Sequence, residues 1–414
     1  MARKKRLRIA AFSYLHADNA HPLSVFSEWG VSDRLGDSLA AVATVWARAA
    51  DEGADAILFL GDLFHRRRPD PTTLSLVARS FASLQGGHAF PLVLVPGNHD
   101  TGAAGGDSTV DVFTALGLEN ARVPQDTEER GALVLKGGGV DFLGYRYERP
   151  PETIGRLESL PAGKRPRVLL LHNDVTGVVD HGWTCPDGIS RRHLADAVAT
   201  LCGHYHTPQV LPREGGALPV LSYGKVDIPP GAVLYLGAAT QLNFGDEGGL
   251  RGMWLLDFEG GDLERAEFMP LGGPRFLTVD IDPTATPHDL AVRVGEDIVD
   301  NGPLTFLKVR CRAPRHLLDA IDRDAFEREA RLTSLRELKE RALDDDALRG
   351  ITWELEPVHE HTARAPLDAK AGLRQLVEAY VESGAVDLDG LDEEDVLDAG
   401  LRILDEVEGK GEAT

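Results

Sequence analysis

The stretch Ala56-Ile57-Leu58-Phe59-Leu60-Gly61-Asp62-Leu63-Phe64-His65 decides the fold, because an apolar run ends there at a glycine and a carboxylate. Ala56–Leu60 has the length and composition of a fully buried strand. The pattern recurs where Gly97-Asn98-His99-Asp100 follows Pro91–Val95 and where Gly203-His204-Tyr205-His206 follows Ala199–Cys202. Buried strands that end at polar, metal-binding side chains predict an α/β sheet with a site beyond its carboxyl edge.

Other short apolar runs predict further strands at Leu7–Phe12, Ala132–Leu135, Arg167–Leu171, Ala232–Leu236 and Met253–Phe258. Helical periodicity at Leu35–Asp51 and Thr72–Leu84 separates the earliest strands. This strand–helix–strand order is typical of a layered α/β core. After about residue 132 the strands follow one another more closely, which predicts a mixed or second sheet.

Gly272-Gly273-Pro274 marks a domain boundary, so we expect a main domain at 1–274, a small unit at 275–325 and a helical region at 326–414. The small unit should contain a strand, a helix, a second strand and the start of another helix. The corresponding ranges are Phe276–Ile281, Pro287–Val299, Leu304–Arg312 and Ala325–Leu343. An irregular stretch should then run to about Pro366, followed by helices at Leu367–Val381 and Asp392–Val407.

Composition excludes several classes of protein. The chain has 414 residues, 43% hydrophobic and 27% charged, which is ordinary for a globular protein and argues against global disorder. Its net charge of −22, most of it after residue 274, argues against wholesale coating of nucleic acid. No apolar window reaches the roughly 20 residues that span a bilayer, and the start lacks a secretion signal. Cys185, Cys202 and Cys311 are too few for a disulfide framework, so we expect a reduced, cytoplasmic setting.

The side chains that follow the predicted strands suit two divalent cations. One carboxylate can bridge two ions, while imidazoles and an amide oxygen fill the remaining positions. Two such ions clamp both oxygens of an in-line phosphoryl displacement. The glycines before Asp62, Asn98 and His204 let the backbone turn and approach closely. The candidate ligands are His16, Asp62, Asn98, His172, His204 and His206.

This ordered set resembles the calcineurin-like metallophosphoesterase superfamily. Gly61–His65 followed by Arg66-Arg67-Arg68-Pro69 is similar to the SbcD-type nuclease subunits of double-strand-break repair. So is Leu234–Asp246 followed by Gly252-Met253-Trp254-Leu255. The motif His172-Asn173-Asp174-Val175-Thr176-Gly177 looks more like the phage recombination endonuclease branch. The match covers residues 7 to about 260.

The resemblance implies a two-sheet αββα sandwich, a small α+β capping domain that shapes DNA access, and a helical C-terminal region. It implies a metal-dependent DNA exo- or endonuclease that uses two ions, with Mn²⁺ favoured over Mg²⁺. Asp62 would bridge the ions, Asn98, His172 and His204 would complete one, and His16 and His206 would serve the other. His99 would be the general acid, oriented by Asp100, and His65 would contact the scissile phosphate.

The resemblance also implies partners: DNA, an SbcC-type coiled-coil ATPase and a second copy of the chain. The apolar stripe on the last predicted helix suits docking of the ATPase and includes Val396, Leu397, Leu401 and Leu404. Candidate DNA contacts are Arg66, Arg67 and Arg68 beside the metal loop. Lys308, Arg310 and Arg312 alternate with apolar residues, so they share one face of a strand. That face is either solvated or in contact with phosphate.

One residue departs from the family pattern. The family has Asp-x-His after the first strand, whereas this chain has Tyr14-Leu15-His16. A phenol with a pKa near 10 is a poor ligand for Mn²⁺ or Mg²⁺. The first ion is therefore expected to bind weakly, unless Asp18 substitutes or the chain is inactivated. Besides a nuclease, the sequence leaves open a non-catalytic scaffold subunit and an enzyme for small phosphodiesters.

Overall fold

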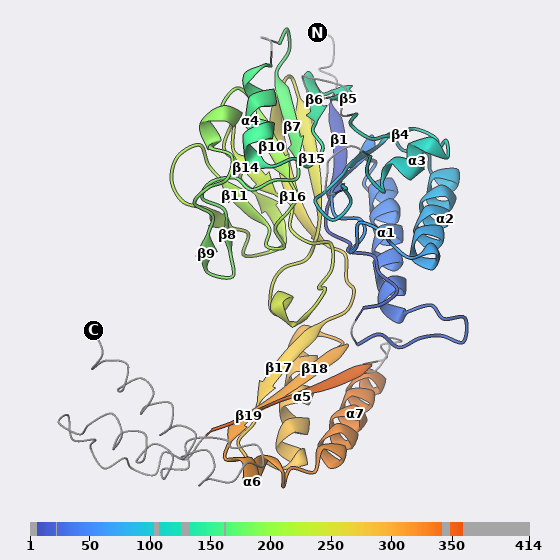
Figure 1. Cartoon of the computed structure of the whole chain (residues 1–414), viewed down its shortest axis with the longest axis vertical. Coiled ribbons are helices and arrows are strands. Elements are labelled where there is room, and N and C mark those ends of the chain that lie inside the picture. The colour runs from blue at the N-terminus through green and yellow to red at the C-terminus, as the bar shows by residue number, and fades with distance from the viewer. Residues whose placement is uncertain are drawn as a thin grey trace, which may run out of the picture. The chain divides into compact units, whose positions relative to one another are not determined.

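The computed structural model describes residues 6–21, 23–102, 107–125, 132–160, 163–341 and 348–358. They fall into two compact units (Figure 1). The first comprises the described residues up to Thr278 together with Asn301–Lys308 and Leu338–Ile351. The second comprises Val279–Asp300, Val309–Glu337 and the described residues from Thr352 onward. The predicted division at residues 274 and 325 stays a prediction.

The first unit contains two seven-stranded sheets. In the first sheet the strand order is β13-β16-β15-β1-β2-β3-β4, and β1 to β4 run parallel. The bounds are β1 Leu7–Phe12, β2 Ala56–Leu60, β3 Leu92–Val95, β4 Ala121–Arg122, β13 Gly224–Val226, β15 Gly252–Glu259 and β16 Asp262–Pro270. β15 pairs antiparallel with β1, from Leu7 opposite Phe258 to Ala11 opposite Trp254.

The second sheet has the order β12-β11-β14-β10-β7-β6-β5, in which β6, β7, β10 and β14 are parallel. The bounds are β5 Ala132–Gly137, β6 Val140–Gly144, β7 Arg167–Leu171, β10 Ala199–Cys202, β11 Gln209–Leu211, β12 Leu218–Pro219 and β14 Val233–Tyr235. The predicted strands therefore exist, each within two residues of its expected bounds. The predicted second sheet is also confirmed.

Alternation along the strands divides their side chains between two layers of core. Ile9, Leu58 and Val93 face the second sheet and pack against Leu170 and Leu234 of that sheet. Phe12, Phe59 and Leu94 face the opposite way, against helices α1 (Asp33–Asp51) and α2 (Pro71–Gly87). The outer face of the second sheet is covered by helix α4 (Pro150–Glu158), which contributes Leu157. The unit is thus an αββα sandwich, as expected (Figure 1).

Local signals start the two large helices. Ser32 caps α1, and its hydroxyl accepts hydrogen bonds from the backbone N–H groups of Arg34 and Leu35. Asp70 caps α2 in the same way, with Pro71 in the first turn, where a missing N–H costs nothing. Short helix α3 (Asp111–Ala115) precedes β4. These helices cover the sheet whose strands β1, β2 and β3 lead into the candidate site.

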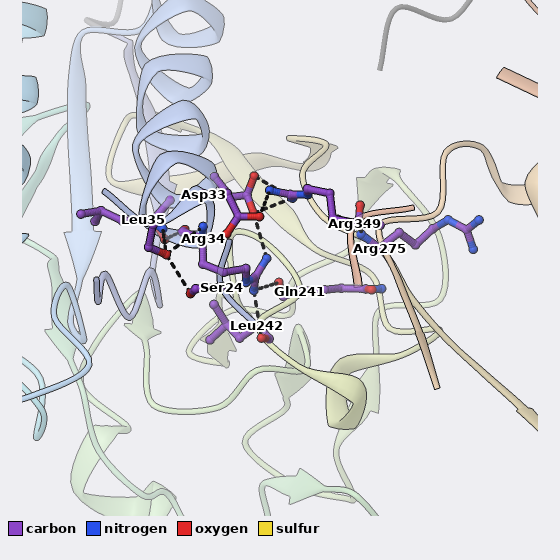
Figure 2. A network of polar contacts seen from close by, with 12 residues as sticks. Ser24, Asp33, Arg34, Leu35, Gln241, Leu242, Arg275 and Arg349 are labelled. Atoms are coloured by element: carbon purple, nitrogen blue, oxygen red, sulfur yellow. Dashed lines mark hydrogen bonds and ion pairs between the residues drawn. The ribbon is translucent and has the colours of Figure 1, made fainter. Parts of the chain in front are cut away.

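A polar network ties the start of α1 to a loop after β14 (Figure 2). Arg349 forms ion pairs with Asp33 and Asp37, each with a closest distance of 2.8 Å. The buried Arg34 donates to the backbone carbonyl of Leu242 at 2.9 Å, and its guanidinium lies over the rings of Phe276 and Phe306. These contacts hold the loop that continues into a short 3₁₀ helix, η2 (Phe244–Asp246).

Strands β17 (Phe276–Asp280), β18 (Phe306–Ala313) and β19 (Gly350–Pro357) form a three-stranded sheet. The accompanying helices are α5 (Pro287–Asn301), α6 (Arg315–Leu318) and α7 (Arg323–Glu340). The expectation of an irregular stretch to about Pro366 is wrong where β19 lies. The missed signal is the alternation of Ile351, Trp353 and Leu355 with polar residues, which is typical of a strand.

The helices predicted at Leu367–Val381 and Asp392–Val407 lie outside the described residues. Among the residues that are described, no helix combines the length and the apolar character that a membrane span requires.

Candidate metal centre

Five strands end at the same place in the first unit. β1, β2 and β3 lie parallel in one sheet, β7 and β10 lie parallel in the other, and each is followed at once by a candidate ligand loop. Because parallel strands bring their carboxyl ends to one edge, segments that lie far apart in sequence meet there. The contacts below show which of the predicted residues come together.

Asp62 lies at the centre of this edge and is fully buried. Its Oδ2 is 3.3 Å from Nε2 of His172 and 3.6 Å from Nε2 of His16. Its Oδ1 accepts a hydrogen bond from the backbone N–H of His99 at 3.0 Å. Oδ2 itself has no hydrogen-bond partner. A buried carboxylate oxygen without a partner is costly, and a cation bound there would satisfy it.

Asn98, His172 and His204 complete a group of donors around that oxygen. Oδ1 of Asn98 lies 3.1 Å from Nε2 of His172 and 3.1 Å from Nδ1 of His204. The donor set is one carboxylate, one amide oxygen and two imidazoles, which suits a divalent ion such as Mn²⁺. The residues predicted for one ion are therefore adjacent, and their chemistry fits it.

The ring nitrogens of His172 and His204 that face away from the site have partners that fix the orientation of each imidazole. Nδ1 of His172 donates to the backbone carbonyl of Leu60 at 2.7 Å, so its Nε2 lone pair faces Asp62 and Asn98. Nε2 of His204 lies 3.2 Å from Asp174, which also accepts a hydrogen bond from the Tyr205 hydroxyl. Such partners hold a histidine ligand in one tautomer. Asp174 is not among the predicted site residues, although it lies within the motif that contains His172.

The charges of Asp62 and His172 support each other. Burial alone would raise the pKa of Asp62, but the adjacent His172 and His16 lower it to well below its usual range. Burial alone would lower the pKa of His172, but the Asp62 carboxylate and the hydrogen bond to Leu60 raise it. The carboxylate and the imidazole therefore each stabilise the charged form of the other.

Tyr14 occupies the neighbourhood of the other predicted ligands. The side chain is buried, and its hydroxyl donates to the backbone carbonyl of His204. The ring centroid lies 4.7 Å from that of His16 and 4.4 Å from that of His206. Burial, and next the charge of Asp62, raise the pKa of Tyr14 well above its usual value. A neutral phenol therefore stands where the resemblance implies an anionic ligand, and the donors there do not fit a first ion.

Asp18 has partners of its own. Its Oδ2 forms an ion pair with Nε of Arg66 at 3.2 Å, and its Oδ1 accepts from the backbone N–H of Ala20 at 3.2 Å. These contacts hold the carboxylate on Arg66 and on its own loop. They give no support to the alternative in which Asp18 replaces the missing ligand.

His206 has a strong partner that the sequence analysis did not identify. Its Nδ1 lies 2.7 Å from Oδ1 of Asp246, and Arg251 binds the same oxygen at 2.8 Å. Oδ2 of Asp246 accepts from the backbone N–H of Leu242 at 2.8 Å. Burial would raise the pKa of Asp246, but His206 and Arg251 lower it well below its usual range. Asp246 thus binds the loop around Leu242, which the contacts of Arg34 also hold.

Three histidines form a cluster on the open side of Asp62. His16, His65 and His99 each offer a ring nitrogen within 4.8 Å of the other two. Nδ1 of His65 lies 3.3 Å from Nδ1 of His16, and Nδ1 of His99 donates to the backbone carbonyl of His65 at 2.7 Å. Burial, and less strongly the neighbouring imidazoles, lower the pKa of His16 well below its usual value. Burial likewise lowers the pKa of His65.

Asp100 does not have the position that the resemblance implies. Its buried carboxylate accepts hydrogen bonds from the backbone N–H groups of Asp62, Leu63, Phe64 and Gly97 at 2.8–3.2 Å. The His99 ring is instead oriented by the carbonyl of His65. Burial and the charge of Asp62 raise the pKa of Asp100 to about 6. Asp100 thus joins the two ligand loops and acts on the site through the backbone.

The backbone of the site is strained and tightly packed. Tyr14, His16, Asp62 and His204 all have positive φ, between 43° and 86°, a conformation that is rare for residues other than glycine and is concentrated at functional sites. A Cβ atom at Gly97 would lie 2.2 Å from Oδ1 of Asp62. The expectation that glycines permit close approach to the ligands is confirmed there.

The predicted DNA-binding arginines lie beside the site. Arg66, Arg67 and Arg68 are exposed, and Nε of Arg67 donates to the backbone carbonyl of Asn98 at 3.2 Å.

The other predicted DNA contacts lie on β18. Lys308 lies 4.8 Å from the centroid of the Phe244 ring, whereas Arg310 and Arg312 form ion pairs with Asp280 and Glu356. The alternation of these three cations with buried residues is as expected. Val396, Leu397, Leu401 and Leu404 lie outside the described residues.

Comparison with known proteins agrees with this geometry. The family described as calcineurin-like phosphoesterase matches residues 7–208. The DNA double-strand break repair protein Mre11 of Archaeoglobus fulgidus is 27% identical over 197 residues, 45% of this chain and 44% of that protein. Mre11 of Haloferax volcanii is 27% identical over 194 residues, 46% of this chain and 41% of that protein. The alignments thus span less than half the length of either relative.

Among solved structures, a dimetal phosphatase from Danio rerio is 9% identical and covers 64% of this chain, with 97% of its own length matched. The TM-score is 0.37, so this superposition adds nothing to the argument.

Proposed function

The chain carries a calcineurin-like phosphoesterase domain over residues 7–208, and on that premise we propose that it is a metal-dependent DNA nuclease of double-strand-break repair or recombination. The observation that carries the proposal is the buried Oδ2 of Asp62, which has no hydrogen-bond partner and faces His172 beside Asn98 and His204. The likeness to two Mre11 proteins supports DNA as the substrate.

Asp62, Asn98, His172 and His204 would hold one divalent ion, for which we propose Mn²⁺, with Mg²⁺ as the alternative. When bound, such an ion supplies Lewis-acid polarisation of a phosphoryl oxygen. The Leu60 carbonyl and the Asp174 carboxylate keep the two imidazoles in the tautomers that ligation requires. The first ion, which the resemblance assigns to His16 and His206, has no comparable donor set beside Tyr14.

His99 is our proposed general acid. Because its Nδ1 donates to the carbonyl of His65, its Nε2 is the nitrogen that exchanges a proton with the reaction. The backbone N–H of the same residue binds Asp62, so the acid is held at a fixed place relative to the metal ligands. Proton donation to the leaving oxygen is the step that this geometry supports.

His65 and the neighbouring arginines would receive the substrate phosphates. His65 is exposed, and Arg67 is held against the carbonyl of Asn98, a proposed ligand. Contacts of this kind position a nucleic-acid backbone without reading its sequence. We propose Arg66, Arg67 and Arg68 as these contacts. Arg310 and Arg312 have acidic partners, so DNA would have to displace Asp280 and Glu356 there.

We also propose that the protein works with an SbcC-type coiled-coil ATPase and as a homodimer. The resemblance to the SbcD-type subunits supports both partners. The proposed docking residues are Val396, Leu397, Leu401 and Leu404.

A second candidate function is a scaffold subunit with impaired catalysis. The observation that favours it is Tyr14, a buried neutral phenol with a hydrogen bond to the His204 carbonyl. In this alternative the fold and the partner-binding role are retained, while only one of the two ions is bound.

Cleavage of linear duplex and hairpin DNA by the metal-stripped full chain, reloaded with Mn²⁺, tests the proposal. We expect cleavage by the parent chain and its loss in Asn98→Ala, which removes a proposed ligand. His288→Ala, at an exposed histidine of α5, is the matched control and should cleave as the parent does. No cleavage by the parent would favour the scaffold. A small chromogenic diester that outcompetes DNA would favour a phosphodiesterase for small substrates.

A further inference from the structure

We propose that His16, His65 and His99 form a separate, nitrogen-only metal site, and that Tyr14 has removed the ion position that the family resemblance places between His16 and His206. This inference rests on the proposed metal-dependent function, but it concerns how many ions bind and of which kind. It follows from the position of one ring and from the distances within one cluster.

The ring of Tyr14 packs against both histidines that would serve the first ion. The centroids of His16 and His206 are 6.1 Å apart, and the Tyr14 centroid lies 4.7 Å from the first and 4.4 Å from the second. The hydroxyl is held by the His204 carbonyl, so the ring is fixed in place. An aromatic ring provides no lone pair for a cation, and this one stands where the resemblance implies a carboxylate ligand.

His206 is held by Asp246, which lies 2.7 Å from Nδ1. His16 has other partners. Its Nε2 is 3.6 Å from Oδ2 of Asp62, and its Nδ1 is 3.3 Å from Nδ1 of His65. The two predicted ligands of the first ion therefore have different partners: His206 contacts Asp246, whereas His16 is part of the cluster with His65.

The spacing of this cluster suits a small tetrahedral ion. Bonds of about 2.0–2.1 Å from Zn²⁺ to imidazole place two ligand nitrogens roughly 3.3–3.4 Å apart. The Nδ1 atoms of His16 and His65 already lie 3.3 Å apart. A nitrogen of His99 lies within 4.8 Å of both, so a modest rotation of its ring would close the triangle.

Apart from the contact between Nδ1 of His16 and Nδ1 of His65, the hydrogen bonds of the cluster leave the required nitrogens free. His99 uses Nδ1 to donate to the His65 carbonyl, so its Nε2 is available as a ligand, and an ion bound there would occupy the nitrogen from which the proposed general acid donates. Nε2 of His16 faces Oδ2 of Asp62 at 3.6 Å, so Nδ1 is the nitrogen that faces the cluster. His65 is exposed, so the fourth position of the ion is open to water or to a phosphate oxygen.

The chemistry of the two sites differs and predicts different ions. The Asp62 site offers a carboxylate and an amide oxygen beside its imidazoles, which suits Mn²⁺. The three-histidine site offers imidazole nitrogen alone, which suits Zn²⁺ or Co²⁺ and binds Mn²⁺ and Mg²⁺ poorly. We therefore expect the number of bound ions per chain to depend on which metal is supplied.

The experiment is a metal count on the full chain. The protein is stripped with a chelator and equilibrated with Zn²⁺ alone or Mn²⁺ alone. Free metal is removed by gel filtration, and bound metal is measured by mass spectrometry. We expect about two Zn²⁺ but about one Mn²⁺ per chain in the parent, and about one of either in His65→Ala. His65 is exposed, so this variant should fold, and circular dichroism checks that it does.

Two variants make the result specific. His288→Ala removes an exposed imidazole of α5 and should keep the parent's zinc content. Asn98→Ala should lower Mn²⁺ binding while keeping the zinc ion of the three-histidine site. With Co²⁺, the parent but not His65→Ala should show the intense visible absorption of tetrahedral coordination.

Unchanged zinc content and an unchanged Co²⁺ spectrum in His65→Ala would overturn the inference, as would a single zinc ion in the parent. The outcome is separable from the proposed nuclease function. Loss of one zinc ion in His65→Ala would stand even if the parent failed to cleave DNA. Conversely, Mn²⁺-dependent cleavage by the parent would stand even if the zinc content were unaffected.

Discussion

The carboxylate of Asp174 lies 3.2 Å from Nε2 of His204, and this contact turns Nδ1 of the imidazole toward Asn98. A partner of this kind fixes the tautomer and the direction of a ligand and raises its basicity. Because Asp174 also accepts a hydrogen bond from Tyr205 at 2.6 Å, its own position is fixed. It is a positioning residue for the metal centre.

Asp174→Ala should weaken Mn²⁺ binding by about 10- to 100-fold, the range found when such partners are lost. Isothermal titration of the metal-stripped chain measures this change. Asp187→Ala, at an exposed position thirteen residues along the chain, is the matched control and should leave the affinity unchanged. Equal affinities in the two variants would show that Asp174 does not position His204.

His99→Ala should reduce Mn²⁺-dependent DNA cleavage by about 10²- to 10⁴-fold, because a general acid contributes that much to a proton transfer. The Mn²⁺ content should stay near that of the parent, since Asp62 and its neighbours hold the ion without the His99 ring. Cleavage rates and metal content are measured on the same preparation. Loss of Mn²⁺ would assign His99 as a ligand of that ion and contradict its role as the acid.

Tyr14→Asp should strongly raise the Mn²⁺-dependent cleavage rate and add an ion to the chain. The substitution removes the ring that packs against His16 and His206 and introduces the carboxylate that the resemblance implies. Tyr14→Phe is the control: it retains the ring and loses only the hydrogen bond to the His204 carbonyl, so it should show neither gain. A Tyr14→Asp chain with parental rate and metal content would show that the missing ligand does not limit catalysis.

Mn²⁺ binding should release a proton and strengthen as pH rises. In the metal-free chain His172 has a raised pKa beside Asp62, so the ion must displace a proton from Nε2. The affinity should therefore increase with pH until the pH exceeds the raised pKa of His172, and then level off. Calorimetry in buffers of different ionisation enthalpy counts the proton, and binding heats that do not depend on the buffer would contradict this prediction.

The same two groups set a window of stability for the metal-free chain. The raised pKa of His172 contributes stability that is complete below about pH 6.5 and is lost as pH rises through its folded value. The lowered pKa of Asp62 contributes stability that is present above about pH 4 and is lost in stronger acid.

Deletion of residues 391–414 should leave the core folded and weaken binding of the coiled-coil ATPase. The reason is the loss of the apolar stripe of Val396, Leu397, Leu401 and Leu404. A pull-down with the ATPase measures binding, and a chain that lacks only 409–414 is the control. Undiminished capture by the longer deletion would refute the docking role.

Much of the fold could be predicted because its signals are local. The run Ala56–Leu60 and the run Arg167–Leu171 are strands with the predicted bounds, since apolar runs that end in polar residues are short-range patterns. The strand at Gly350–Pro357 carried a similar signal in Ile351, Trp353 and Leu355, but the charged residues around it obscured the alternation.

The composition of the site could be predicted, but its contacts could not. Asp62, Asn98, His172 and His204 each follow a strand, so parallel topology was enough to bring them together. The partners Asp174 and Asp246 lie within the quoted motifs, but nothing in those motifs shows which histidine each carboxylate contacts. The expected pairing of Asp100 with His99 was replaced by four backbone hydrogen bonds.

By itself, the sequence determined the order of strands and helices and the kinds of side chain that end each strand, because backbone propensity and hydrophobic period act over a few residues. Only the tertiary structure decided that Tyr14 packs against His16 and His206 and that His65 and His99 gather with His16. These contacts join residues up to 192 positions apart, and they depend on the packing of two sheets and on backbone turns with positive φ. No local pattern encodes that packing, because each distance follows from the combined geometry of many residues.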